Sequence, residues 1–293
     1  MLFPDFRIQD IAVNGVTIRA AHGGNRAGPP LLLLHGHPQT HAIWHRIAPA
    51  LAERYYVVTT DLRGYGDSDK PAGLPDHANY AKREMALDQV EVMRSLGFSR
   101  FLLCAHDRGA RVAHRLCVDH PAVVEKAIFL DIAPTLAMYE RTSMDFATSY
   151  WHWFFLIQPS PLPERLLEAD PAFYVRSVMS RGAEGLDVFD PAALSEYIRA
   201  AQIPGAIHAM CEDYRAAAGI DLIHDRADRD AGRKVECPLK VLWGGRGVIE
   251  KCFDALALWR EVARSVEGGP LDCGHYIAEE APDALLAEIR AFF

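Results

Sequence analysis

A single carboxylate, Asp107, stands where a strand pattern breaks abruptly into a helix pattern. The apolar run 101–105 has the length of a buried strand, and the helix-compatible segment 110–120 ends at Pro121, a residue that helices rarely cross. A carboxylate is a poor nucleophile toward ordinary esters, but it can displace a leaving group from saturated carbon and form an alkyl ester on the protein. A helix N-terminus also favours its ionised form. The alternative is that Asp107 only caps the helix, because aspartate is a favoured N-cap residue.

Three more polar residues follow predicted strands: His37, Asp131 and His275. In doubly wound sheets the carboxyl ends of the parallel strands meet at one edge, where ligands bind. The chain order of Asp107, Asp131 and His275 is that of nucleophile, acid and histidine in one class of catalytic triad. Each has a structural alternative, since Asp131 can cap a following segment and His275 can be a surface loop histidine. Because all of these residues follow strands that end at the same edge of the sheet, a catalytic role is favoured over the separate structural roles.

Two arginines, Arg108 and Arg111, directly follow the carboxylate. Three residues apart on a helix, they share a face beside Asp107. Two guanidinium groups there can bind a substrate carboxylate through paired hydrogen bonds. They also offset the repulsion between an anionic nucleophile and an anionic substrate. The alternative is a surface helix face, which we expect for Arg115 one turn later.

Aromatic and polar side chains gather in the segments Tyr150–Phe154 and Cys211–Arg215. We expect most of them to serve packing. His152, Trp153 and Tyr214, however, each carry a polar hydrogen donor. Three such donors can bind a departing halide. Fluoride benefits most, because hydrogen bonds that strengthen as charge develops help a poor leaving group most.

Four histidines lie close together in the segment 35–45: His35, His37, His41 and His45. The last two are one helical turn apart, so a metal site is an alternative for this segment. No carboxylate or cysteine accompanies them, and we expect no metal. Instead, the backbone N–H groups of His37 and Arg108 are predicted to form an oxyanion hole. They would stabilise the tetrahedral oxyanion formed when water attacks an ester of Asp107.

Strand and helix patterns alternate along most of the chain. Strands are predicted at 6–13, 16–21, 31–34, 55–60, 101–105, 126–130, 238–244 and 265–269. Helices are predicted at 43–54, 80–96, 110–120 and 282–293. Asn14-Gly15 predicts a hairpin turn between the first two strands. The alternation predicts an α/β fold with a mostly parallel eight-stranded sheet and helices on both faces.

The alternation stops between residues 133 and 235, where the sequence is helical in pattern, rich in aromatics and punctuated by prolines. We interpret this stretch as a helical lid inserted after the sixth strand. The predicted domains are therefore a core of residues 1–133 and 236–293 and a lid of residues 134–235.

Composition limits the partners. At 293 residues the chain is near the upper size for one hydrophobic core, which suits a core with an insertion. The net charge of −8 argues against nucleic acid or an anionic membrane as a partner, so an anionic substrate needs a local basic pocket. No signal peptide or membrane-spanning run is evident, and the six cysteines lack Cys-x-x-Cys spacing. We expect a cytoplasmic protein with reduced thiols.

Taken together, these motifs resemble the fluoroacetate dehalogenase (haloacetate dehalogenase) family of the α/β-hydrolase fold. The resemblance runs nearly end to end and covers His35–His41, His106–Arg111, Leu130–Thr135, Tyr150–Trp153, Asp213–Arg215 and Gly274-His275. It implies roles for eight residues: Asp107 as nucleophile, His275 as base, Asp131 as its orienting acid, Arg108 and Arg111 as carboxylate ligands, and His152, Trp153 and Tyr214 as halide ligands.

The position in the chain of the acid that orients the histidine distinguishes this sequence from serine esterases of the same fold. Serine esterases of this fold usually take the acid from the turn after the seventh strand. Here that turn, 244–248, contains no carboxylate, and Glu250 is the first to follow. Asp131, after the sixth strand, is therefore predicted to be the acid.

The resemblance also implies a mechanism. Asp107 attacks the halogen-bearing carbon, and His275 then activates a water that hydrolyses the ester, giving halide and a 2-hydroxy acid (glycolate from fluoroacetate). A stereogenic carbon would be inverted, because only the first step touches it. No cofactor or metal is implied. The expected partners are a small 2-haloacid and water, and an exposed helical lid is compatible with a homodimer.

Two other readings remain open. An epoxide hydrolase shares the carboxylate nucleophile and the His-Gly-x-Pro loop but uses two lid tyrosines as acids, for which Tyr139, Tyr174, Tyr197 and Tyr214 are candidates. Epoxide hydrolases and haloalkane dehalogenases usually carry tryptophan after the nucleophile, so Arg108 favours an acid substrate. A non-catalytic binding protein of the same fold has no need of an intact triad.

Overall fold

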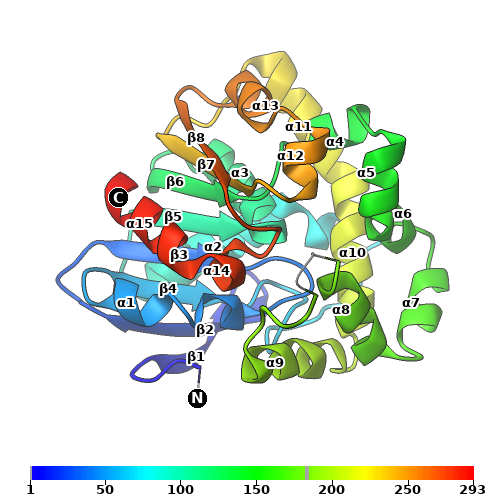
Figure 1. Cartoon of the computed structure of the whole chain (residues 1–293), viewed down its shortest axis with the longest axis horizontal. Helices are drawn as coiled ribbons and strands as arrows, with labels where there is room; N and C mark the ends of the chain where they lie inside the picture. The colour runs from blue at the N-terminus through cyan, green and yellow to red at the C-terminus, as the bar shows by residue number, and fades with distance from the viewer. Residues whose placement is uncertain (1, 182–184) are drawn as a thin grey trace.

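An eight-stranded sheet forms the centre of the molecule (Figure 1). The computed structural model describes residues 2–181 and 185–293. The strands are β1 (Arg7–Val13), β2 (Val16–Gly24), β3 (Pro30–Leu34), β4 (Tyr56–Thr60), β5 (Phe101–His106), β6 (Val124–Leu130), β7 (Leu239–Gly244) and β8 (Val266–Leu271). Their order across the sheet is β1-β2-β4-β3-β5-β6-β7-β8. Pairing is parallel from β4 to β8 and antiparallel for β1 with β2 and β2 with β4, which confirms the predicted mostly parallel sheet.

The predicted hairpin between β1 and β2 is confirmed. The strands pair down to Val13 and Val16, which leaves Asn14 and Gly15 as the turn. Both have positive φ, +44° and +74°. A two-residue turn of this kind matches the right-handed twist of the two strands, and asparagine and glycine adopt it most readily.

Helices cover both faces of the sheet, and the side chains of the strands alternate between two cores. Leu32 and Leu34 pack in one buried cluster, and Leu31 and Leu33 pack in the other. The first cluster includes residues of α2 (Lys82–Ser95), α3 (Arg108–Asp119) and α13 (Ala255–Val262). The second includes residues of α1 (Ala48–Ala52), α14 (Ile277–Glu280) and α15 (Pro282–Phe292). A strand buried on both faces explains why the run 31–34 is apolar throughout.

The helix predicted over 43–54 was wrong as a single element. The structure has a short 3₁₀ helix, η1 (His41–Trp44), followed by α1 (Ala48–Ala52). Pro49 lies in the first turn of α1. Proline lacks the N–H that a continuous helix needs and is favoured at a helix start, so the helix begins again there.

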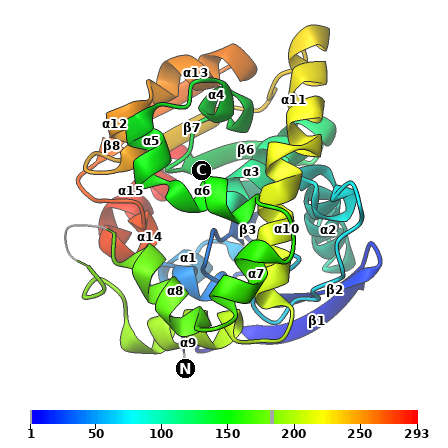
Figure 2. The same ribbon diagram turned by 90° about the vertical axis from the view of Figure 1, so that its right-hand side faces the viewer.

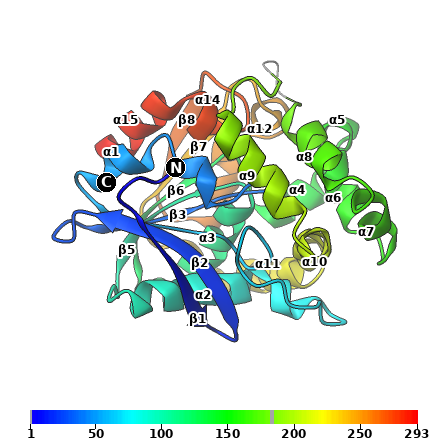
Figure 3. The same ribbon diagram turned by 90° about the horizontal axis from the view of Figure 1, so that it is seen from below.

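A helical segment separates β6 from β7 in the chain. Its helices are α4 (Thr135–Glu140), α5 (Met144–Ser149), α6 (Trp151–Leu156), α7 (Leu162–Leu167), α8 (Pro171–Met179), α9 (Pro191–Ala201), α10 (Ala206–Ala218) and α11 (Ile220–Ala231). Figures 1 and 2 show them together on one side of the sheet, and Figure 3 shows α5–α8 on the side away from α1. No helix of the described residues is long and apolar enough to cross a membrane.

Candidate active site

Asp107 lies in a tight turn between β5 and α3. Its φ of +45° and ψ of −114° lie in a region that residues with a Cβ avoid. The neighbouring backbone is equally close: a Cβ on Gly109 would lie 2.3 Å from the carbonyl oxygen of His35, and one on Gly36 would lie 2.5 Å from the Cβ of Asp107. Such strained turns persist where the surrounding structure enforces them, typically at functional sites.

The Asp107 carboxylate contacts one of the two predicted oxyanion-hole donors. The backbone N–H of His37 donates to Oδ1 over 2.9 Å. Arg108 is the first residue of α3, so helix geometry gives its N–H no partner within the helix. Burial alone would raise the pKa of Asp107, but the positive charges of His275, His106, Arg111 and Arg108 outweigh it and hold that pKa well below its ordinary value. The carboxylate is therefore ionised at neutral pH.

His275 and Asp131 form a hydrogen-bonded pair. Nδ1 of His275 lies 2.5 Å from Oδ2 of Asp131, and the N–H of Gly244 donates to Oδ1 over 2.8 Å. Because the carboxylate accepts, Nδ1 carries the proton and Nε2 keeps a lone pair that can act as a base. Burial would lower the pKa of His275, but Asp131 and Asp107 raise it above its ordinary value. Glu250 instead accepts a hydrogen bond from the indole of Trp243.

Arg108 is fully buried, and Asp213 occupies two sides of its guanidinium. Nε donates to Oδ2 over 2.8 Å, and Nη2 donates to Oδ1 over 3.0 Å and to the backbone oxygen over 2.8 Å. Lys82 also pairs with Asp213, and the Tyr65 hydroxyl donates to it over 2.7 Å. Burial alone would lower the pKa of Arg108, but Asp213 raises it well above its ordinary value. Of the three guanidinium nitrogens of Arg108, Nη1 alone has no partner among the described residues.

Arg111 differs from Arg108, because no carboxylate of residues 2–181 or 185–293 is paired with it. Its guanidinium donates to neutral acceptors, the oxygen of Ala133 (3.2 Å), Oγ1 of Thr135 (2.9 Å) and Sδ of Met138 (3.3 Å), and Nε has no partner among these residues. Burial and the charge of Arg108 lower the pKa of Arg111. The nearby charge of Asp107 offsets only part of the cost of burying this cation, because no carboxylate pairs with it directly, so an anionic ligand would be stabilised here.

The three predicted halide ligands come together from α6 and α10. The Trp153 ring lies 4.5 Å from the guanidinium carbon of Arg111, and the Tyr214 ring lies 4.1 Å from that of Arg108. The centroids of the Trp153 and Tyr214 rings are 6.2 Å apart, and those of His152 and Tyr214 are 5.8 Å apart. The indole N–H of Trp153 and the hydroxyl of Tyr214 are buried and have no partner in the described part of the chain. Both donors are thus available to a ligand beside the two arginines.

A cavity of about 420 Å³ lies beside the base. Its lining includes His275, Tyr150, Trp151 and Arg181. The hydroxyl of Tyr150 lies 3.3 Å from Nδ1 of His275. The imidazole of His275 therefore borders a cavity in which a water molecule could reach it.

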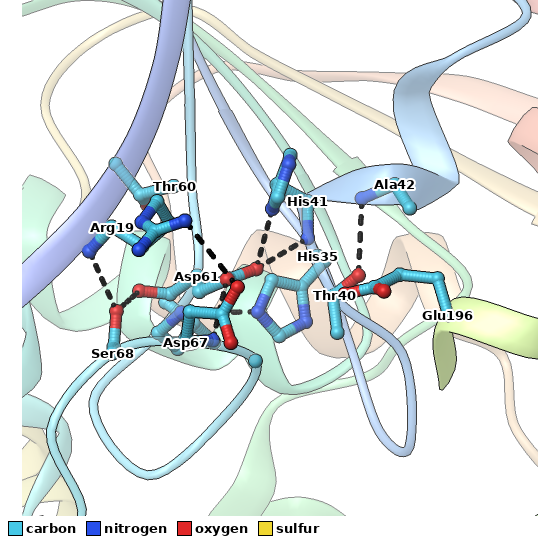
Figure 4. Close-up of polar contacts among 12 residues, drawn as sticks. Arg19, His35, Thr40, His41, Ala42, Thr60, Asp61, Asp67, Ser68 and Glu196 are labelled. Atoms are coloured by element: carbon cyan, nitrogen blue, oxygen red, sulfur yellow. Dashed lines mark hydrogen bonds and ion pairs between the residues drawn. The ribbon is translucent and has the colours of Figure 1, made fainter. Parts of the chain in front are cut away.

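The four histidines of the segment 35–45 have separate partners. His35 accepts at Nε2 from the N–H of Leu62 over 3.0 Å, and Nδ1 of His41 lies 2.8 Å from Asp61. Figure 4 shows His35 and His41 beside Asp61. His37 bonds the Tyr174 hydroxyl, and His45 the backbone of Ala42. Within the described residues, no three His, Cys, Asp or Glu side chains are arranged to hold a metal ion.

Three residues with contacts at the site were not assigned a role from the sequence. Asp213 and Arg181 contact predicted ligands, and His106 donates from Nε2 to the backbone oxygen of His275 over 2.8 Å. Asp213 belongs to a motif of the resemblance, and His106 precedes the nucleophile, so their places in the chain were the only signals. No spacing rule links position 213 to 108 or 181 to 152, because these contacts join separate elements.

Comparison with known proteins is consistent with this architecture. The family described as alpha/beta hydrolase fold matches residues 29–282. The chain is 45% identical to a fluoroacetate dehalogenase from Burkholderia sp, over 99% of this chain and 95% of the relative. The chain belongs to the fluoroacetate dehalogenase family of the α/β-hydrolase fold. The predicted resemblance is confirmed, and membership of this family makes the protein a hydrolase.

Other relatives with the α/β-hydrolase fold are named for other activities or for the fold alone. A soluble epoxide hydrolase from Corynebacterium sp. (strain C12) is 32% identical, over 96% of this chain and 95% of the relative. Among solved structures, a putative α/β hydrolase from Nostoc sp PCC 7120 superposes with a TM-score of 0.95 at 53% identity, covering 98% of this chain and 97% of that one. These similarities establish the fold, but the relatives have different named activities, so the substrate is inferred from the residues of the site.

Proposed function

We propose that this hydrolase is a haloacetate dehalogenase that cleaves the carbon–halogen bond of small 2-haloacids, fluoroacetate among them. The observation that carries the proposal is the state of Arg111: a buried guanidinium beside Asp107 that pairs with no carboxylate of the described residues. A substrate carboxylate would supply that counter-ion. Nη1 of Arg108 and Nε of Arg111, both without a partner among the described residues, are donors available to it.

In the first step, Oδ2 of Asp107 attacks the carbon that bears the halogen. The carbon–oxygen bond forms as the carbon–halogen bond breaks, and the electron pair leaves with the halide. The hydrogen bond from His37 ends on Oδ1, which leaves Oδ2 as the attacking oxygen. The indole N–H of Trp153 and the hydroxyl of Tyr214, together with His152, would bind the departing halide as its charge develops.

In the second step, Nε2 of His275 takes a proton from a water that attacks the carboxyl carbon of the Asp107 ester. The negative charge then develops on Oδ1, where the N–H groups of His37 and Arg108 stabilise it. Collapse of this intermediate expels the alkoxide, which takes the proton from Nε2 of His275 and leaves as the 2-hydroxy acid. Asp107 loses the second proton of the water to solvent and is restored as a carboxylate. Asp131 holds the imidazole in its working tautomer and stabilises its protonated form.

Epoxide hydrolysis is the second candidate, and one observation favours it. Besides Tyr214, the hydroxyl of Tyr139 is buried and has no partner in the described residues, so two tyrosine hydroxyls are available as acids. By contrast, the hydroxyl of Tyr174 contacts His37 and that of Tyr197 contacts Glu279. A neutral epoxide, however, would leave Arg111 without a directly paired carboxylate, which is why we favour the acid substrate.

A substrate panel tests the proposal. We expect halide release from fluoroacetate and chloroacetate and no hydrolysis of styrene oxide. Hydrolysis of styrene oxide without halide release from either acid would indicate an epoxide hydrolase instead. Activity on neither class would indicate a binding protein.

An isotope experiment tests the ester intermediate. In a single turnover in ¹⁸O-water, the attacking water adds its oxygen to the carboxyl carbon of Asp107. The label should therefore appear in the Asp107 peptide, and the first hydroxy acid released should be unlabelled. Label found directly in the product would exclude the aspartyl ester.

A further inference from the structure

His152 contributes a ring whose two nitrogens have different surroundings. Nδ1 lies 3.0 Å from Nη1 of Arg181. The ring stacks on that of His37, with centroids 5.9 Å apart and planes 9° from parallel. Its edge faces the Tyr214 ring. Stacking and burial leave the ring little freedom to turn away from this arrangement.

Arg181 is itself held in place. Its Nη1 also donates to the backbone oxygen of Ser149 over 2.9 Å, and its Nε donates to that of Val178 over 2.7 Å. The guanidinium carbon lies 5.3 Å from the centre of the Tyr150 ring. These contacts join the end of α8 to the junction between α5 and α6, so both ends of this link hold the guanidinium.

A guanidinium can only donate hydrogen bonds. The Nδ1 atom that it contacts must therefore be the acceptor, and the proton of a neutral imidazole must sit on Nε2. Burial, reinforced by the charge of Arg181, lowers the pKa of His152 well below its ordinary value, so the ring is neutral at neutral pH. The opposite tautomer would present a lone pair at Nε2, which repels a halide.

We propose that Arg181 is a positioning residue of the halide pocket, which holds His152 in the tautomer with Nε2–H as its donor. This inference rests on the proposed function for its consequence in catalysis. Its effect should depend on the leaving group: fluoride, which needs hydrogen bonds most, should be affected most, and bromide least. A residue with only a structural role would slow the release of both halides equally.

Three variants test the inference by rapid measurement of halide release in a single turnover. Arg181→Met removes the donor, Arg181→Lys keeps a charged donor, and Arg176→Met is the matched control. Arg176 is an exposed residue of α8, the helix that ends just before Arg181, and its replacement changes the net charge by the same amount. We expect Arg181→Met to slow fluoride release by roughly tenfold and bromide release by less than about threefold. Arg181→Lys should recover most of the loss, and Arg176→Met should match the parent enzyme.

The competing explanations give different results. Equal slowing of fluoride and bromide release would overturn the inference in favour of a structural role. A rise in KM that is the same for all haloacids and vanishes at high salt would overturn it in favour of electrostatic steering by Arg181.

A direct measurement covers the case in which Arg181→Met fails to fold. In the ¹⁵N-histidine spectrum of the wild-type enzyme, the His152 signal, identified by its loss in His152→Gln, should show an unprotonated Nδ1 and a protonated Nε2. A protonated Nδ1 would overturn the inference. This readout is independent of turnover, so an enzyme that releases no halide from any haloacid would remove the proposed function without deciding the tautomer.

Discussion

Replacing Arg111 by methionine should weaken substrate binding without lowering the free energy of unfolding, and the contacts of Arg111 set the size of the first effect. Arg111 makes hydrogen bonds only to the neutral acceptors Ala133, Thr135 and Met138 among the described residues. A charge-assisted hydrogen bond to a substrate carboxylate contributes about 1.5–3 kcal/mol, which corresponds to roughly a 10- to 100-fold change in affinity. The substrate carboxylate keeps its charge through the first step, so the loss should appear mainly in KM and less in kcat.

The same substitution should leave the free energy of unfolding unchanged or raise it. No carboxylate pairs directly with this buried guanidinium, and the nearby charge of Asp107 does not fully offset its burial, so removing the charge relieves an unfavourable term. Arg115→Met is the matched control on the same helix. The expected surface position of Arg115 was wrong: its side chain is buried and pairs with Asp119 and with Asp225 and Asp228 of α11. Breaking that buried network should lower stability by about 3 kcal/mol and leave KM for haloacids nearly unchanged.

The assay is halide release at varied fluoroacetate and chloroacetate concentrations, with urea unfolding of each variant. A KM for Arg111→Met within about twofold of the parent value would refute the assignment of Arg111 as the carboxylate ligand. A large loss of stability in Arg111→Met would refute the argument that its charge is uncompensated in the folded protein.

Three further predictions concern the triad and the buried acid of the lid. His275→Asn should stop after the first step, because no base remains for water, so mass spectrometry should find a haloacid-derived adduct on the Asp107 peptide; an unmodified enzyme would contradict the mechanism. Because Asp131 raises the pKa of His275 and the base must be neutral, the rate of ester hydrolysis in a single turnover should rise with pH through a limb above the ordinary histidine value; a limb below it would contradict that shift. Asp213→Asn should lower the free energy of unfolding by about 3–5 kcal/mol in denaturant titrations, because it leaves the buried guanidinium of Arg108 without its partner; unchanged stability would show that the pair is not needed by the fold.

Local sequence patterns were sufficient for the sheet and the turn that carries the nucleophile. The run 31–34 and the strand before Asp107 are short, apolar and bounded, and such runs form buried strands almost regardless of their neighbours. The pattern failed at 43–54, where Pro49 divides a helix that periodicity alone would continue. The predicted domain limits at 134 and 235 also rest on a local signal, the change from alternating strands and helices to a helical pattern alone.

The sequence by itself determined which residues stand at the strand ends, and so which types of side chain can meet there. It could not determine which of the charged side chains at these strand ends are paired with one another. That Asp213 neutralises Arg108 while Arg111 pairs with no carboxylate of the described chain depends on α10 packing over α3, a contact between residues about a hundred positions apart. Likewise, Arg181 reaches His152 only because the turn after α8 lies against α6. Ion pairing and tautomers are set by distances of a few ångströms, and those distances exist only once the tertiary structure has formed.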